Sequence, residues 1–438
     1  MPFHPHTDVD RAQMLDRIGV GRLEDLFADV PERARFPGLS LPPALSELEV
    51  ERELRRVASG TARLAERPSF LGAGAARHFV PATVDAVLRR GELFSAYTPY
   101  QPELSQGLLQ AMFEYQTMTC ELTGMDVSTA SHYDGAVALA EVALMALSAT
   151  RRKKLLVSPT LDPRYRDVLA TYLGGSDAEL CALGEPDDAT AACIVQSPSY
   201  LGQLEPVPTI AAAVHAAGGL MIVVPDPVSL GLLRSPGEEG ADLVAADGVG
   251  LGIPPTFGGP HLGIVAVKQA HMRRTPGRLV GETLDADGRR GWVLTLGTRE
   301  QHIRREKATS NICTNAALSA LAAAVHLATL GRAGLRRVAE LCFHKSHYAA
   351  AEIAALPGCS VNPQAPEQPF FKEFVVELPV GAERANRAIE AELGVVGGRP
   401  LALDFDAAGM ERRLLLAVTE LHTKQDIDAL VAVLGKLS

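Results

Sequence analysis

The chain has 438 residues, 47% of them hydrophobic and 21% charged, and its formal net charge is −10. This composition excludes a disordered, fibrous or low-complexity chain. The acidic balance, without a basic cluster, argues against nucleic-acid binding, which needs positive charge to displace phosphate counterions. Six scattered cysteines form no C-x-x-C pair, which excludes a zinc ribbon or disulfide scaffold and indicates the reducing cytoplasm.

No membrane span, export signal or metal site is predicted. The first ten residues are polar. The richest apolar run, residues 316–330, is too short to cross a bilayer, so we expect a buried helix there. The twelve histidines show no metal-ligand spacing, and the chain has no P-loop or G-x-S-x-G motif.

Residues 1–65 are predicted to form a helical N-terminal arm. Thr7 can cap a first helix, which Gly19 ends, and a Pro-rich linker over 31–43 precedes a second helix that ends near Gly60. We favour an arm packed on a larger body. A separate binding module is the alternative.

Residues 66–326 are predicted to form a large α/β domain. Two long helices, over 103–123 and 135–149, precede short apolar strands that alternate with helices. Such strands are typical of a mostly parallel sheet covered on both faces, with ligands at the carboxyl ends of the strands. The expected strands are 154–158, 179–183, 192–196, 220–224, 243–246 and 263–267.

Residues 327–438 are predicted to form a small α+β domain. Gly435 lies just past its last helix, a position where glycine commonly ends helices. The expected helices are 334–356, 384–393 and 424–434, and the expected strands are 371–378 and 413–418.

A polar and aromatic segment, residues 95–107, precedes the first long helix. Its two prolines stiffen a non-helical backbone. The segment is either a structural start of the helix or a preorganised wall of a pocket, and the residues alone favour neither. Its candidate side chains are Ser95, Tyr97, Thr98, Tyr100, Gln101 and Glu103, the last at the positive end of the helix dipole.

A second segment, residues 131–138, begins the Ala-rich helix. Free N–H groups at a helix N-terminus can bind an anion. Asp134 stands at the expected cap position, where its carboxylate would satisfy these groups and repel a phosphate. We therefore favour a structural role for this start of a helix.

A third segment, residues 299–315, combines charges of both signs with hydroxyl and amide groups. Mixed charges usually form a solvated face or an ion-pair network. The helix dipole could activate Cys313, although we favour an inert thiol. A phosphate or interface cradle could be formed by Thr309, Ser310, Asn311 and Thr314.

Asp226 follows the apolar strand expected over 220–224, and one β-unit later comes the Gly- and Pro-rich loop 247–261. This arrangement is typical of pyridoxal-phosphate (PLP) enzymes of the aminotransferase architecture. In those enzymes an aspartate keeps the pyridine nitrogen protonated and a lysine forms the Schiff base.

Four segments, in order and at matching spacing, point to a family: residues 97–103, 133–136, 258–261 and 306–314. In these segments the chain resembles the P-protein (glycine decarboxylase) family of the glycine cleavage system, as the N-terminal subunit of its two-subunit bacterial form. The resemblance covers most of the chain. It implies a fold type I, aminotransferase-like large domain with a seven-stranded, mostly parallel sheet.

The chain departs from catalytic members of that family at the Schiff-base lysine. Aligned on the loop before His261, Gly248 and Val249 stand where those members carry His and Lys. Only eight of the 42 basic residues are lysines, and none lies between Asp226 and Lys268. The resemblance therefore implies a subunit with no covalent cofactor, a vestigial Asp226, and a partner subunit that carries the PLP.

The resemblance also implies a reaction and partners. With a second subunit, in an α2β2 complex, the chain would decarboxylate glycine and transfer the aminomethyl group to the lipoyl group of H-protein. The loop 97–103 would line the partner's glycine pocket, and the segment 309–314 would border it. The isolated chain would be inactive.

Two alternatives stay open. A self-sufficient PLP enzyme of another specificity would need an imine lysine in this chain, with Lys268 as the first candidate. A purely structural subunit would dock the H-protein without touching the substrate.

Overall fold

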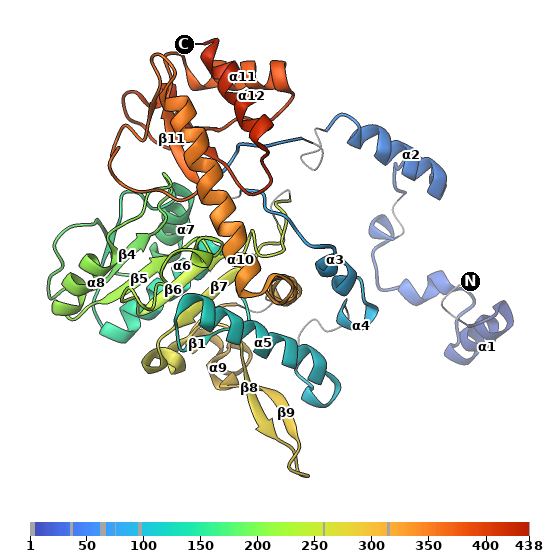
Figure 1. Cartoon of the computed structure of the whole chain (residues 1–438). Helices are drawn as coiled ribbons and strands as arrows, with labels where there is room; N and C mark the ends of the chain where they lie inside the picture. Colours follow the sequence, from blue (N-terminus) through green and yellow to red (C-terminus); the bar gives the residue numbers. More distant parts are fainter. Residues whose placement is uncertain are drawn as a thin grey trace. The chain divides into compact units, whose positions relative to one another are not determined.

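The computed structural model describes residues 5–35, 38–61, 67–74, 76–94, 99–256, 259–312 and 316–437. The chain divides into two units, Met1–Arg63 and Leu64–Ser438 (Figure 1). Among the described residues, only the second unit contains β-sheets.

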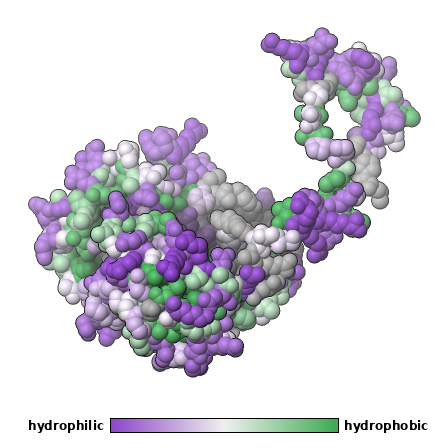
Figure 2. All heavy atoms as spheres, turned by 90° about the horizontal axis from the view of Figure 1, so that it is seen from above, coloured by the Kyte–Doolittle hydropathy of each residue, from purple (hydrophilic) through white to green (hydrophobic). Residues whose placement is uncertain are grey.

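The first unit is helical and exposed. Helix α1 (Asp8–Ile18) is capped by Thr7 and ends at Gly19, as predicted. Helix α2 (Glu47–Ala58) begins with a Ser46 capping box. The described part of this unit buries no side chain, and Figure 2 shows its apolar residues as green patches among hydrophilic ones. Two 3-10 helices lie between α1 and α2 in the sequence, η1 (Leu23–Phe27) and η2 (Glu32–Ala34).

A seven-stranded sheet organises the second unit. Its strand order is β1-β7-β6-β5-β4-β2-β3. Strands β3, β2, β4, β5 and β6 pair in parallel, whereas β7 is antiparallel to both β6 and β1. The predicted, mostly parallel sheet is confirmed. Its strands are β1 (Val127–Ser128), β2 (Lys154–Val157), β3 (Glu179–Ala182), β4 (Thr190–Gln196), β5 (Leu220–Val224), β6 (Leu243–Asp247) and β7 (Gly263–Val267).

Helices cover both faces of this sheet. Because successive strand residues point to opposite faces, Leu155 packs in one core cluster with helices α6 and α7, while Leu156 packs in another with α8. Burial on both faces is the reason that the strands read as continuous apolar runs in the sequence. The helices are α5 (Gln106–Thr123), α6 (Gly135–Thr150), α7 (Pro163–Leu173) and α8 (Val207–Ala216).

A four-stranded antiparallel sheet, with the order β10-β11-β13-β12, forms a second core. Its buried side chains, such as Phe374 and Leu416, pack with helices α11 and α12 and with the later part of α10. The strands are β10 (Ser360–Val361), β11 (Glu373–Glu377), β12 (Arg399–Pro400) and β13 (Arg413–Ala417), and the helices are α11 (Ala382–Leu393) and α12 (Lys424–Gly435).

A hairpin that the sequence analysis did not predict packs against α5. It consists of β8 (Leu279–Leu284) and β9 (Arg290–Thr295), which share a core cluster with this helix. The long helix begins at Gln106 rather than at 103, because Pro102–Leu104 form a 3-10 turn. The other short helices are α3 (Ala82–Leu88), α4 (Gly91–Phe94), α9 (Gln301–Arg304), η4 (Ser229–Gly231), η5 (Gln269–Arg274), η6 (Gly297–Arg299), η7 (Arg305–Lys307), η8 (Leu401–Leu403) and η9 (Met410–Arg412).

Helix α10 (Ala317–Ala354) crosses the border expected between residues 326 and 327. It joins the two helices expected over 316–330 and 334–356 and bends at Gly331, whose φ is 59° and ψ −178°. By length and composition alone, α10 could cross a membrane, but 44% of its most apolar window is buried within the unit. Such burial is typical of a core helix.

The bend at Gly331 leads to a prediction about stability. Its φ and ψ values belong to a region that only glycine adopts easily, although a Cβ there would meet no atom within 4 Å. We expect Gly331→Ala to lower the free energy of unfolding by about 1–3 kcal/mol, measured by urea denaturation. Gly107→Ala, in open space on α5, is the control and should stabilise by about 0.5 kcal/mol.

Candidate functional site

A cavity of about 60 Å³ lies at the carboxyl ends of β4, β5 and β6. This is the edge at which parallel sheets bind ligands. The volume leaves room for only a few water-sized molecules. The sheet contributes Gln196, Val224, Asp226, Asp247 and Val249, the C-terminal part of the unit contributes Phe371, Lys372 and Glu373, and the remaining lining residues are Gly74, Ala76, Tyr165, Pro198, Gly202, Pro225 and Pro227.

Asp226 is ion-paired inside this cavity. The Nζ of Lys372 lies 2.6 Å from its Oδ2, and Lys372 is only 7% exposed. Burial acts to lower the pKa of Lys372, but Asp226 and Glu373 outweigh it and the pKa is raised. Burial would likewise raise the pKa of Asp226, yet Lys372 lowers it. Both groups are therefore charged at neutral pH.

The ion pair continues into a chain of hydrogen bonds. Lys372 Nζ lies 2.9 Å from His78 Nε2, and His78 Nδ1 lies 2.8 Å from Glu420 Oε2. Because an ammonium can only donate, Nε2 accepts and the Nδ1–H donates to Glu420. Burial opposes ionisation of Glu420, but its bond with His78 brings the pKa down to about 2.

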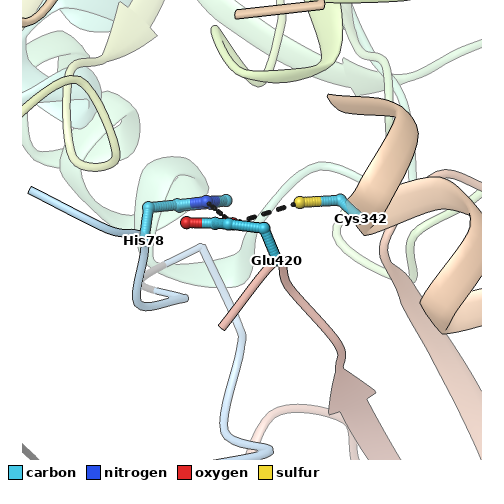
Figure 3. Close-up of side chains that lie close together, drawn as sticks. All are labelled: His78, Cys342 and Glu420. Atoms are coloured by element: carbon cyan, nitrogen blue, oxygen red, sulfur yellow. Dashed lines mark hydrogen bonds and ion pairs between the residues drawn. The ribbon is translucent and has the colours of Figure 1, made fainter. Parts of the chain in front are cut away.

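His78, Glu420 and Cys342 point toward one another from three separate segments (Figure 3). Cys342, on α10, donates to Glu420 Oε2 at 3.4 Å, and burial raises the pKa of its thiol. The ligand atoms of these three residues lie within 4.8 Å of one another. They are metal-ligand types, but they already bond to one another, and the ammonium of Lys372 would repel a cation beside them.

Two carboxylates occupy the N-terminus of α6, and one of them, Asp247, also lines this cavity. Asp134 is the cap, and its Oδ1 accepts from the Val137 amide at 2.8 Å, as predicted. Asp247 Oδ2 accepts from the Gly135 amide at 3.0 Å. Asp247 was not predicted to act here, because it reaches the helix only through the fold.

Val249 stands at the expected imine position and lines the same cavity. Its side chain is buried, and its amide donates to Asp247 Oδ1 at 2.9 Å. The residues present therefore do not fit PLP. The position expected for the imine lysine holds an aliphatic side chain, the Lys372 ammonium is paired with Asp226, and carboxylates accept from the helix amides that a phosphate would need.

Lys268 does not belong to this cavity. It follows β7, and its Nζ lies 3.1 Å from Asp242 Oδ1, away from the lining residues of the cavity. The first candidate for an imine lysine is thus placed elsewhere in the fold. Lys372 lines the cavity, but its position far along the sequence from Asp226 gave no signal except the small number of lysines.

The first predicted segment is described in part. Ser95, Tyr97 and Thr98 lie outside the described residues, whereas Gln101 and Glu103 are exposed. Glu103 lies in the 3-10 turn and not in the first turn of α5, which corrects the expectation about the helix dipole.

Tyr100 is 54% exposed, but its hydroxyl has a buried hydrogen-bond partner. Arg278 Nη2 donates to it at 3.0 Å, and the guanidinium carbon lies 5.4 Å from the centre of its ring. Arg278 is itself buried and also pairs with Glu300 at 3.4 Å. The sequence analysis missed Arg278, which lies at the start of the unpredicted hairpin.

The third predicted segment also lies beside Arg278. Arg278 and Arg299 line a small cavity together with Thr309 and Ser310. Asn311 is exposed, and Cys313 and Thr314 lie outside the described residues. The structure thus brings Tyr100, from the first segment, and the Thr309–Ser310 end of the third segment around one buried arginine. The cavities at Arg278 and Asp226 share no lining residue.

Ser310 also binds a buried carboxylate. Its Oγ donates to Glu141 Oε1 at 2.7 Å, and Glu141 is 3% exposed. Burial raises the pKa of Glu141 to about 7, although the bond from Ser310 acts to lower it. A hydroxyl of the predicted cradle is therefore engaged within the chain.

With this geometry in hand, comparison with known proteins identifies the family. The sequence model of the family described as glycine cleavage system P-protein matches residues 2–434. The chain belongs to this family. It is 51% identical over 449 residues to the probable glycine dehydrogenase (decarboxylating) subunit 1 of Thermomicrobium roseum, with 99% of each chain covered.

Solved structures agree with the sequence relatives of the family. A crystal structure of glycine decarboxylase (P-protein) of the glycine cleavage system, in inhibitor-bound form, matches with a TM-score of 0.91, 46% identity and full coverage of both chains. A mutant of C-DES with glycine covalently linked to its PLP cofactor shares the fold, with a TM-score of 0.62, 14% identity, and 88% of this chain and 99% of that chain covered. The fold type I architecture and the resemblance to the P-protein are confirmed.

The buried Glu141 leads to a prediction about pH. Between pH 4.5 and about 7 the folded chain keeps the proton that the unfolded chain releases, so this residue makes stability fall as pH rises through that window. We expect Glu141→Gln to remove this loss, gaining up to about 3 kcal/mol over the wild type at the upper end. Urea denaturation at several pH values measures it. Glu121→Gln, at an exposed site, should show no such trend.

Proposed function

We propose that this chain is the subunit of a glycine dehydrogenase (decarboxylating) complex that does not carry PLP. A second subunit would hold the cofactor covalently, in an α2β2 assembly with lipoylated H-protein as the acceptor. The observation that supports this most strongly is the cavity at Asp226, where Val249 lines the wall at the expected imine position and the Lys372 ammonium is paired with Asp226. The relatives that this chain matches over almost their full length are named subunit 1, which supports the same assignment.

In the complex, the reaction would release carbon dioxide from glycine and transfer the aminomethyl group to the lipoyl group. PLP would supply the electron sink for this chemistry in the partner subunit. This chain would contribute the wall formed by loop 97–103, in which Arg278 holds the Tyr100 hydroxyl in place. The neighbouring Thr309 and Ser310 would border that wall.

We expect the complex to be cytoplasmic. Five of the six cysteines lie among the described residues, and none of these five forms a disulfide. Reduced thiols are typical of a reducing compartment.

The first test of this proposal uses the isolated chain. Because Val249 stands at the expected imine position and Lys372, the lysine that lines the cavity, is paired with Asp226, we expect no Schiff-base absorbance with PLP and no glycine decarboxylation. Co-purification with the second subunit should restore glycine–bicarbonate exchange. Exchange by the isolated chain, or a borohydride-trapped PLP on Lys268, would instead support a self-sufficient enzyme.

The second test asks whether Tyr100 faces substrate or only supports assembly. Tyr100→Phe removes the hydroxyl that Arg278 orients, and we expect a loss of about 5- to 30-fold in kcat/KM for glycine in the reconstituted complex, with assembly unchanged. Tyr348→Phe is the control, because its hydroxyl bonds Asp428 in the C-terminal part of the unit. Unchanged kinetics with weaker assembly would favour the purely structural role.

A further inference from the structure

The vestigial cofactor site is not an empty remnant. We propose that the chain occupies this site with its own charges: the Lys372 ammonium stands in for the pyridinium at Asp226, and the Asp247 carboxylate stands in for the phosphate at the N-terminus of α6. This inference rests on the proposed function in one respect, namely that PLP belongs to the partner. It adds that the loss of one lysine is not what now excludes the cofactor.

Lys372 and the cofactor would compete for Asp226. In PLP enzymes the aspartate binds the pyridine nitrogen, and the imine lysine bonds to the carbon at the opposite end of the ring. Lys372 Nζ lies 2.6 Å from Asp226 Oδ2, the contact that the ring nitrogen would make. Lys372 is therefore at the wrong end of the site to act as the imine lysine, and it competes with the cofactor for the aspartate.

The N-terminus of α6 is the part of the site where a phosphate would be expected. A helix N-terminus that opens on a cavity offers its free N–H groups to a phosphate. At α6 the Gly135 amide already donates to Asp247 and the Val137 amide to Asp134. A phosphate arriving here would displace these bonds and meet two negative charges.

The C-terminal sheet closes the cavity at the strand ends. Lys372 and Glu373 enter the cavity from the start of β11, and Glu373 Oε1 accepts from the Ala73 amide at 2.6 Å. Burial raises the pKa of Glu373 to about 7, although Lys372 acts to lower it. Gly202 lies so close to the Glu373 carbonyl that no side chain would fit there. The C-terminal sheet thus sits directly on the strand ends and is held there by the pair of Lys372 with Asp226.

The test restores the lysine with and without the internal occupants. Three forms of the isolated chain, V249K, V249K/K372M and V249K/K372M/D247N, are incubated with PLP, reduced with borohydride, and mapped by mass spectrometry for a pyridoxyl group on residue 249. We expect no labelling of V249K, and at least tenfold more labelling of the triple variant. V249K/K268M is the matched control, because Lys268 pairs with Asp242 outside the cavity.

Each outcome decides the proposal. Labelling of V249K alone to the level of the triple variant would show that Lys372 and Asp247 do not occlude the site. A folded triple variant that stays unlabelled would show that something else excludes PLP. Either result overturns the inference, while leaving the activity of the wild-type complex, and so the proposed function, intact.

A second measurement covers variants that fold poorly. If the ion pair holds the C-terminal sheet in place, K372M and D226N should each lower the Tm more than the double variant D226N/K372M, which leaves no unpaired buried charge. In K372M and D226N, hydrogen exchange should also rise in the segment around Ala73 and His78, which contacts Glu373 and Lys372. Additive losses of Tm with unchanged exchange would contradict the closure.

Discussion

The buried ion pair between Lys372 and Asp226 is the constraint on which the centre of this molecule depends. Removing two charges from water is costly, and such a pair persists only where further partners complete its hydrogen bonds. His78 accepts from Lys372 and donates to Glu420, while the amide of Val228 donates to Asp226. These groups come from segments that the fold alone brings together. The pair of Lys372 with Asp226 thus joins the start of the C-terminal sheet to the segment that follows β5.

The same arrangement explains how the chain can belong to the P-protein family and still have a centre unlike that of a PLP enzyme. The fold places Asp226, after β5, in the cavity, and it places the N-terminus of α6 against Asp247, which lines the same cavity. Here both positions are neutralised from within, by a cation at the aspartate and by carboxylates at the helix. The surface around Tyr100 is built differently, on buried arginine. The cavity at Asp226 and the cavity at Arg278 share no lining residue, so the two groups of predicted site residues are separated in space.

Much of the fold could be predicted because its signals are local. The Thr7 and Asp134 caps act on amides three residues away, and the apolar strands reflect burial on both faces of one sheet. The hairpin β8–β9 was missed because its exposed residues hide the alternating pattern. At the site, Tyr100 and Ser310 were candidates, but Arg278, which joins their segments, was not. It lies 178 positions from Tyr100, beyond the reach of any spacing argument.

The sequence by itself determined the family and the mostly parallel sheet, and it led to the prediction that Val249 stands where catalytic members carry the imine lysine. These features depend on residue type and on neighbours within a few positions. Only the tertiary structure decided which groups Lys372 and Asp247 contact. Lys372 and Asp247 have unremarkable sequence surroundings. Lys372 meets Asp226 where the C-terminal sheet packs on the strand ends, whereas Asp247 meets Gly135 because β6 ends beside the start of α6. An absent residue is visible in a sequence, but the charge that compensates for it is found only where distant segments meet.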